Sequence, residues 1–342
     1  MATLTFKPKN ISKKIMGNLN ERAYDVVLNR FGLGGESERK TLESIGNMYS
    51  ITRERVRQIE NAALMAIKKS DAFEQEKAVF DELKELMVSL GSVVHEGDLL
   101  SHISKDKLSQ NHINFFLVLG DEFTRHKDDD HFNARWSVDN DVDGHIHDGL
   151  KNLYKSLNND DIIAEADMID QFLDEIKSLN HEYKNQEIAR RWLLLSKKIS
   201  RNPLGEWGKA TSSNIKTKGV KDYAFLVMRQ HGSPMHFREV AKSITEVFKK
   251  KTNSATCHNE LIKDARFVLV GRGTYGLSEW GYRHGVVKDV LRDILKEKGA
   301  LSKDDIIELM MKERFLKRNT IMVNLQNPKY FKKTKDGLYK AV

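Results

Sequence analysis

The sequence predicts a mainly α protein, in which a helix-turn-helix precedes tandem winged-helix domains with small β-hairpin wings. Two observations support this fold class. One segment near the start has the pattern of two helices that cross at a tight turn, and a helix-helix-helix-hairpin pattern recurs along the rest of the chain. With 342 residues the chain is long enough for several small domains. We expect domains at 1–70, 71–140, 141–210, 211–283 and 284–342.

The helix-turn-helix is predicted within residues 41–69. A short helix is expected over 41–48, and a second helix is expected to open at Thr52, which is a good N-cap residue. Gly46 supplies the small residue that such a crossing needs. The apolar positions that would pack the two helices on each other are Leu42, Ile45, Ile51, Val56 and Ile59.

The second helix of this pattern carries polar side chains in its first two turns. In a helix-turn-helix these positions face base edges in the DNA major groove. Arginine can bind guanine through two hydrogen bonds, Gln58 can do the same with adenine, and Glu54 can accept from a cytosine amino group. The alternative is an amphipathic helix with a solvated charged face. The candidate base-reading residues are Arg53, Glu54, Arg55, Arg57 and Gln58.

Residues 21–69 resemble region 4 of the housekeeping-type bacterial sigma factors, which reads the −35 promoter element. The matching words are RAYDVVLNRFGLGG, TLESIG and ITRERVRQIENAAL, in the family's order and spacing. The resemblance implies base contacts for Arg53, Glu54 and Gln58. It implies contacts with DNA or with neighbouring activators for Arg55 and Arg57. The residues that it places along the phosphate backbone are Arg22, Arg30, Thr41 and Leu42.

The same resemblance implies two partners, double-stranded DNA and the RNA polymerase core, because region 4 in the family also docks on the polymerase flap. A complete sigma factor would carry a helical region with an aromatic row, which captures melted promoter DNA, ahead of region 4. Here residues 1–20 precede the match, and no promoter-melting module is visible. We therefore expect a protein that does not open promoters unaided.

The recurring pattern is clearest in its third copy, which runs from KDYAFLVMRQHGSPMHFREV to RFVLVGRGTYGLSEWG with a hairpin turn at Gly271–Gly273. The last copy has its turn at Lys335–Gly337, and the first copy has its turn in the run Lys127–Asp130. A degenerate copy lies between the first and the third. Each copy is expected to end on a strand whose aromatic residue covers a small core, namely Trp136, Trp207, Trp280 or Tyr339.

The third copy, from Val220 to Tyr282, resembles the HARE-HTH family, a winged-helix module found in the delta subunit of RNA polymerase and in some chromatin and restriction proteins. The words HGSPMHFREVAKSI and RFVLVGRGTYGLSEW carry the resemblance. It implies binding to nucleic acid or to polymerase and does not separate the two. Arg272 stands in the predicted wing turn, where it would be free to contact phosphate.

Charge is distributed unevenly along the chain. Residues 1–70 hold 13 Lys and Arg against 7 Asp and Glu, residues 71–210 hold 17 against 28, and residues 211–342 hold 27 against 14. Because binding to nucleic acid depends on neutralising phosphates, the two ends suit DNA and the middle does not. The middle suits a basic protein surface, such as one on RNA polymerase, or is a soluble spacer. Further phosphate-contact candidates near the wings are Lys249, Lys250, Lys251, Lys332, Lys333 and Lys335.

Several other classes of function are disfavoured. The apolar runs are too short to span a membrane, and the single cysteine, Cys257, excludes intramolecular disulfides and Cys-based zinc fingers, which fits a reducing, cytoplasmic compartment. His145–Asp148 and Asp128–Asp130 lack further ligands at metal spacing. Cys257 and His258 are adjacent in a helix and would point in different directions. We expect no cofactor, no metal and no enzyme activity.

These observations predict a bacterial transcription factor that binds promoter DNA and associates with RNA polymerase. Two rivals remain open. One is a polymerase-bound accessory or decoy protein that contacts the flap without reading bases. The other is the DNA-recognition subunit of a restriction or DNA-processing system.

Overall fold

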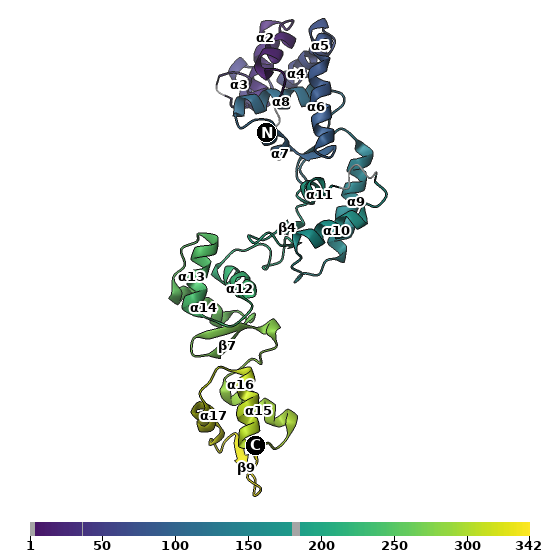
Figure 1. The fold of residues 1–342 in the computed structure, drawn as a ribbon. Coiled ribbons are helices and arrows are strands. Elements are labelled where there is room, and N and C mark those ends of the chain that lie inside the picture. The colour runs from purple at the N-terminus through teal and green to yellow at the C-terminus, as the bar shows by residue number, and fades with distance from the viewer. Residues whose placement is uncertain (1–3, 36, 180–184) are drawn as a thin grey trace. The chain divides into compact units, whose positions relative to one another are not determined.

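The computed structural model describes residues 4–35, 37–179 and 185–342 and confirms a mainly helical protein with small antiparallel sheets (Figure 1). The chain forms two compact units. Unit 1 comprises Met1–Ser200 and Trp207–Ala210, and unit 2 comprises Arg201–Glu206 and Thr211–Val342. In the ranges that the structure describes, no helix is both long and apolar enough to cross a lipid bilayer.

The first part of unit 1 contains the predicted helix-turn-helix, formed by α3 and α4. Thr52 caps α4 as expected, because its hydroxyl oxygen accepts a hydrogen bond from the backbone N–H of Arg55 (3.2 Å). Thr41, expected inside the first helix, is its N-cap and accepts from the N–H of Ser44 (3.1 Å). The helices of this part are α1 (Pro8–Ile15), α2 (Glu21–Phe31), α3 (Leu42–Tyr49), α4 (Arg53–Lys68) and α5 (Asp71–Gln75).

A small core holds α2, α3 and α4 together. Val26, Ile45 and Val56 are fully buried in it. The other predicted packing residues, Leu42, Ile51 and Ile59, line its edge together with Tyr49, so the predicted apolar set is confirmed.

The two helices approach each other most closely at Gly46. A Cβ atom added to Gly46 would lie 2.6 Å from the carbonyl oxygen of Ile51, which belongs to the backbone of the turn. The Ile51 N–H donates a hydrogen bond to the Gly46 carbonyl (2.9 Å), so the turn closes directly on this glycine. No larger residue fits without a shift of the backbone.

The helix-turn-helix shares its hydrophobic core with the helices that follow it. One continuous core runs from Ile15 to Trp136. Helix α8 is buried along most of its length, and its Phe115 ring lies 5.0 Å from the ring of Phe31 on α2. Elements that follow α5 are α6 (Lys77–Ser89), β1 (Val93–His95), α7 (Glu96–Ile103), α8 (Lys107–Leu119), β2 (Thr124–His126) and β3 (Arg135–Ser137).

Asn111 on α8 fixes the segment that joins α2 to α3. Its amide nitrogen donates to the carbonyls of Gly32 (3.0 Å) and Ser37 (2.7 Å), and its amide oxygen accepts from the Arg39 guanidinium (2.8 Å). Asn111 is itself fully buried. A single side chain therefore satisfies the backbone of the loop that leads into the helix-turn-helix.

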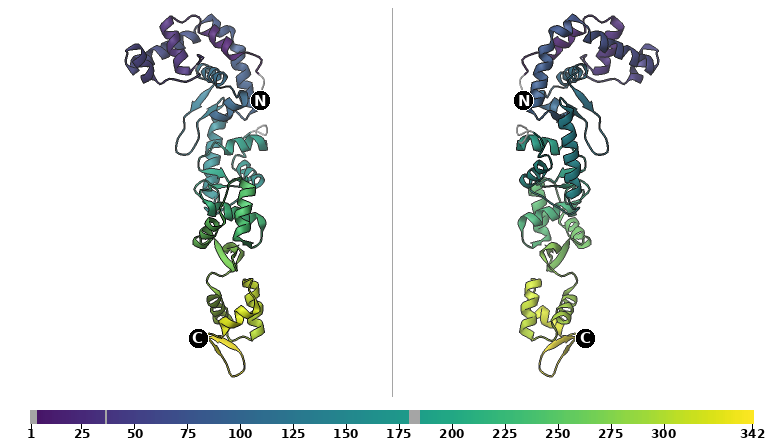
Figure 2. Two further views of the ribbon diagram at one scale, coloured as in Figure 1. Left: turned by 90° about the vertical axis from the view of Figure 1, so that its left-hand side faces the viewer. Right: turned by 90° about the vertical axis from the view of Figure 1, so that its right-hand side faces the viewer.

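The strands of the first copy form a sheet in the order β1-β3-β2, and the predicted hairpin turn at 127–130 lies between β2 and β3. Figure 2 shows the long β2–β3 connection extending from this sheet. Trp136 on β3 is buried, as expected. Unit 1 continues with α9 (Asn140–Ser156), α10 (Glu165–Glu175), α11 (Gln186–Leu193), β4 (Ile199–Arg201) and β5 (Trp207–Lys209), and Trp207 is buried in a second core.

The third copy lies in unit 2 and has the expected order of three helices and a hairpin. Its sheet has the order β6-β8-β7, and the turn falls at Arg272 and Gly273 as predicted. The elements are α12 (Val220–His231), β6 (Met235–His236), α13 (Phe237–Phe248), α14 (Ser254–Lys263), β7 (Phe267–Gly271) and β8 (Thr274–Leu277).

The expectation for Trp280 is wrong. Strand β8 ends at Leu277, where the Ser278 N–H donates to the Arg266 carbonyl (2.8 Å), and Trp280 lies beyond it in a short 3-10 helix. The chain turns there because Leu277 already pairs with Phe267, the first residue of β7. The aromatic residue that covers the core from the strand is Tyr275, which is buried.

The last copy also matches its predicted pattern. Its core contains Val290, Ile294 and Ile306, and Tyr339 packs against it from the last strand. After α16, the Phe315 N–H donates to the Val270 carbonyl (2.6 Å), so this segment adds to the free edge of β7. The elements are α15 (Val287–Lys298), α16 (Lys303–Glu313), α17 (Arg318–Leu325), β9 (Phe331–Lys333) and β10 (Tyr339–Ala341).

A partly buried ionic network centred on Arg266 joins segments of the third copy. The guanidinium binds Asp264 (2.8 and 3.0 Å) and Asp222 (2.9 Å), and lies over the ring of Phe225. Burial acts to raise the pKa of the Asp264 carboxyl, but the hydrogen bonds from Arg266 outweigh it and lower that pKa to about 2. Asp264 therefore stabilises the fold as an anion.

Replacing Gly46 with alanine should destabilise unit 1 by about 1–3 kcal/mol, because the new methyl group would collide with the Ile51 carbonyl. Urea unfolding measures the change. The matched control is Gly144→Ala on α9, where nothing lies within 4 Å of the added methyl group. That change should stabilise the protein by about 0.5–1 kcal/mol, and equal responses at the two sites would contradict the close approach.

Acid should weaken unit 2 through Asp264. Since the pKa in the folded state (about 2) lies below the ordinary value of 3.8, the stabilisation is complete above the ordinary value and is lost as pH falls toward 2. Between about pH 4 and pH 2 the parent should lose on the order of 2 kcal/mol more stability than Asp264→Asn. The control is Asp336→Asn, in an exposed hairpin turn, which should lose stability with falling pH as the parent does. If Asp264→Asn also loses stability as the parent does, the acid sensitivity does not come from Asp264.

Candidate nucleic-acid interface

The first two turns of α4 project into solvent. Val56 is fully buried, while the five predicted base-reading side chains around it are exposed. The helical period explains this division, because one residue of the turn faces the core and its neighbours face away. The exposed residues are Arg53, Glu54, Arg55, Arg57 and Gln58.

Two hydrogen-bonded pairs order these side chains. Arg57 donates to the Glu54 carboxylate through two nitrogens (2.6 and 2.9 Å), and Arg55 donates to the Gln58 amide oxygen (3.0 Å). The Arg53 side chain makes no hydrogen bond or ion pair with another described residue. Gln58 uses both its amide oxygen and its nitrogen to bind adenine, and its oxygen has a second lone pair beside the one that Arg55 occupies.

The charge state of Glu54 suits an acceptor. The hydrogen bonds from Arg57 lower the pKa of the Glu54 carboxyl, with the positive charge of Arg57 acting in the same direction. Glu54 is therefore ionised at neutral pH and can accept hydrogen bonds only, as the interaction with a cytosine amino group requires.

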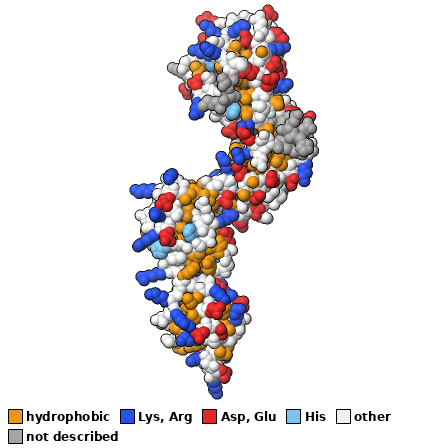
Figure 3. All heavy atoms as spheres, viewed as in Figure 1, with side chains coloured by type: hydrophobic (Ala, Val, Ile, Leu, Met, Phe, Trp, Pro, Cys, Tyr) orange, Lys and Arg blue, Asp and Glu red, His pale blue; other side chains and the backbone are white. Residues whose placement is uncertain are grey.

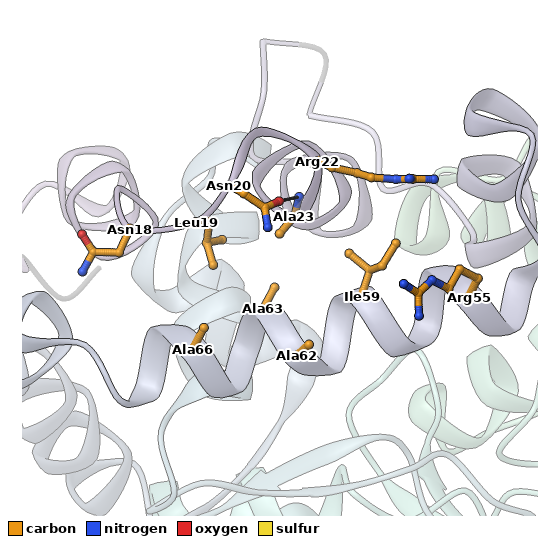
Figure 4. Close-up of a pocket in the computed structure, with 10 residues that line it drawn as sticks. All are labelled: Asn18, Leu19, Asn20, Arg22, Ala23, Arg55, Ile59, Ala62, Ala63 and Ala66. Carbon is orange, nitrogen blue, oxygen red and sulfur yellow. Dashed lines mark hydrogen bonds between the residues drawn. The ribbon is translucent and has the colours of Figure 1, made fainter.

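The phosphate-contact residues predicted for this segment lie on α2, which packs on the helix-turn-helix, and at the start of α3. Arg22 is exposed in the first turn of α2. It lines a groove of about 400 Å³ between the start of α2 and α4, and Figure 4 shows its side chain at the same end of that groove as Arg55. Arg30 is partly exposed and pairs with Glu60 (3.3 Å).

Thr41 and Leu42 stand at the N-terminus of α3. Thr41 is exposed, and Leu42 is half-buried against the small core. Helix N-termini carry unpaired N–H groups that bind phosphate oxygens, so this position is chemically suited to a DNA backbone. The structure thus brings the predicted contact residues of the first segment together on α2, α3 and α4, whereas Arg272 and the six predicted lysines belong to unit 2.

Arg272 occupies the tip of the β7–β8 hairpin and is exposed. Gly273 beside it adopts φ +71°, and a Cβ atom there would lie 2.7 Å from the His236 ring nitrogen. The Phe237 N–H also donates to the Gly273 carbonyl (2.9 Å). The wing turn is therefore packed against the start of α13, which fixes the place from which Arg272 projects.

Basic side chains gather on the side of this module that carries α13, as Figure 3 shows. Lys249–Lys251 follow α13 directly, at the opposite end of this helix from the wing turn, which packs on Phe237. The sequence analysis missed Arg238 and Lys242, which are exposed on α13 one helical turn apart. Their spacing of four residues on the predicted second helix places them on one face, and this could have identified them as a basic surface. By contrast, the third helix, α14, has one basic residue, Lys263, and this lies in its last turn.

Cys257 is a fully buried thiol in α14, and burial raises its pKa to about 11. It is therefore protonated at neutral pH and a poor nucleophile. The neighbouring His258 ring instead stacks on Phe237 (4.3 Å). In the part of the chain that the structure describes, no group of three or more His, Cys, Asp or Glu residues could hold a metal ion.

Comparison with known proteins finds similarity at these two surfaces. Residues 15–69 match the family model for Sigma-70, region 4. Residues 219–280 match the HARE-HTH model, which describes an HTH domain of ASXL and restriction endonuclease proteins. Both resemblances expected from the sequence are confirmed.

The curated relatives match the region 4 segment. RNA polymerase sigma factor RpoD of Helicobacter pylori is 43% identical over 56 residues, sigma factor SigA of Nostoc sp. is 43% identical over 56, and sigma factor RpoS of Coxiella burnetii is 47% identical over 53. Each alignment covers 16% of this chain and 8%, 14% and 15% of the respective relative. This chain therefore carries a helix-turn-helix similar to sigma region 4, and it spans only a small part of the length of these relatives.

Proposed function

We propose that this protein is a sigma-like DNA-binding transcription factor that reads a −35-like promoter element with α4 and associates with RNA polymerase. The observation that carries the proposal is the exposure of Arg53, Glu54 and Gln58 on a capped helix whose opposite face is buried. The similarity of residues 15–69 to sigma region 4 supports the same role. No catalytic step belongs to this function.

In this proposal the polar residues of α4 have distinct tasks. Arg53, which has no hydrogen-bond or ion-pair partner among the described residues, binds a guanine edge, Gln58 binds adenine and the ionised Glu54 accepts from cytosine. Arg55 and Arg57 leave their intrahelical partners and contact DNA or a neighbouring protein. Positioning on the phosphate backbone comes from Arg22, Arg30, Thr41, Leu42 and the Thr52 cap.

Unit 2 supplies a second contact of another kind. Its basic side chains lie on α13, on the loop after it and at the Arg272 wing tip, whereas α14 has almost no charge. A surface of this type neutralises phosphates and does not distinguish bases. We propose that it strengthens DNA binding without adding sequence preference.

Polymerase association is the second part of the proposal. The groove beside α4 is lined by the small side chains of Ala62, Ala63 and Ala66, and offers a partner protein space close to the helix backbone (Figure 4). If the protein is a polymerase-bound accessory without base reading, a pull-down on core polymerase should succeed while salt-dependent binding to promoter DNA is absent. Our proposal expects that the pull-down on core polymerase succeeds and that the protein also binds promoter DNA in a salt-dependent way.

Replacing Arg53 or Gln58 with alanine should cost about 1–3 kcal/mol of binding to a −35-like duplex and relax base preference at one position, because a bidentate base contact is lost. Fluorescence anisotropy at fixed salt, with the specific and a scrambled duplex, measures both effects. Lys84→Ala, at an exposed position of α6, should change neither. If both variants bind like the parent, base reading by α4 is ruled out.

Replacing Arg272 with alanine should weaken binding to every duplex by the same factor, because a phosphate contact carries no sequence information. The slope of log K against log salt should become shallower by about one unit. A salt titration on two unrelated duplexes measures this, with Lys303→Ala on α16 as control. A loss confined to one sequence would show that Arg272 reads bases, contrary to the proposal.

A further inference from the structure

A pocket in the acidic middle of the chain is separate from both proposed DNA surfaces. It lies in unit 1 between α9, the tip of the β2–β3 hairpin and the start of β4, and encloses about 420 Å³. This size is in the range of sites for small molecules. Its lining combines Tyr154 and the almost fully buried Phe132 and Leu150 with three lysines, Lys151, Lys155 and Lys198.

Backbone hydrogen bonds hold the pocket open. Phe132 and Ser196 form an antiparallel bridge, the Lys197 N–H donates to the His131 carbonyl (2.7 Å), and the Asn133 N–H donates to that of Leu195 (2.9 Å). These bonds fasten the hairpin tip to the segment that leads into β4. The walls therefore exist before any ligand binds, which lowers the conformational cost of binding.

The lysines that line the pocket have no carboxylate partner among the described residues. Among residues 4–35, 37–179 and 185–342, no carboxylate lies within ion-pair distance of Lys151, Lys155 or Lys198. The adjacent Lys197, by contrast, pairs with Asp128 (2.6 Å). A further cation, Lys209, lies 4.8 Å from the centre of the Tyr154 ring. This concentration of unpaired positive charge stands out because residues 71–210 hold 17 Lys and Arg against 28 Asp and Glu.

Helix α9 supplies both apolar and basic side chains to the pocket, and the helical period explains how. Leu150 and Tyr154 are four residues apart on α9 and share one face, while Lys151 and Lys155 form a parallel row beside them. An apolar row thus runs next to a cationic row. A ligand that fits has an apolar body along the first row and a negative charge near the second.

We propose that this pocket binds a small apolar carboxylate, such as an aliphatic or aromatic acid. The walls offer few hydrogen-bonding groups for the edge of a nucleobase. The rings are also already engaged, since Phe132 contacts the His147 ring (4.3 Å) and the Arg135 guanidinium (5.2 Å), and Tyr154 contacts Lys209. Both points favour an apolar body over a stacked base.

Isothermal titration of the full-length protein with octanoate and with 2-naphthoate tests the proposal, and the two acids distinguish an aliphatic from an aromatic body. At least one should bind with a Kd below about 1 mM. Octan-1-ol, which has the same chain as octanoate without the charge, should bind at least about tenfold more weakly than octanoate if octanoate is the ligand. The double variant K151Q/K155Q should weaken acid binding by about tenfold.

The matched control is K105Q/K107Q, which removes two exposed lysine charges elsewhere in unit 1 and should bind the acids like the parent. The proposal is overturned if neither acid binds in this range, or if K151Q/K155Q binds them as the parent does. It is also overturned if that variant keeps its affinity for the acids and loses affinity for DNA, which would make these lysines phosphate contacts.

Discussion

The close approach at Gly46 is the constraint on which the exposed polar face of α4 depends. Because the backbone of the turn passes directly over this glycine, α3 and α4 cross at one fixed distance. Val56 then points into the small core with Ile45, and the helical period turns Arg53 and Gln58 outward. The exposed polar face is thus a consequence of a contact between two backbone segments.

The two segments of the chain that are similar to known families present different chemistry. The first offers side chains with distinct donor and acceptor patterns, which is what recognition of bases requires. The second offers lysines and arginines on α13 and a hairpin tip, beside a third helix that is nearly uncharged. In the proposed function, the first segment supplies selectivity and the second supplies sequence-independent attraction.

Local signals predicted much of this structure. Thr52 marked the start of α4, and Gly273 and Gly337 marked the turns of the last two wings, because caps and positive-φ turns depend on a few neighbouring residues. Contacts between distant segments gave no such signal. Asn111 meets Gly32 only after α8 has packed, and the lysines of α9 meet Phe132 only through the hairpin tip. The prediction for Trp280 failed because Tyr275 is the aromatic residue on β8 that covers the core, and Trp280 lies after the strand has ended.

The core shared between the helix-turn-helix and α8 has a mechanical consequence. Phe31 and Asn111 join α2 and the loop after it to α8, and Ala63 and Ile67 of α4 lie in the same core. Helix α4 is therefore packed on the helices that follow it. In the proposed function, a partner that binds the outer surface of α6 or α7 acts on the orientation of α4 through this core.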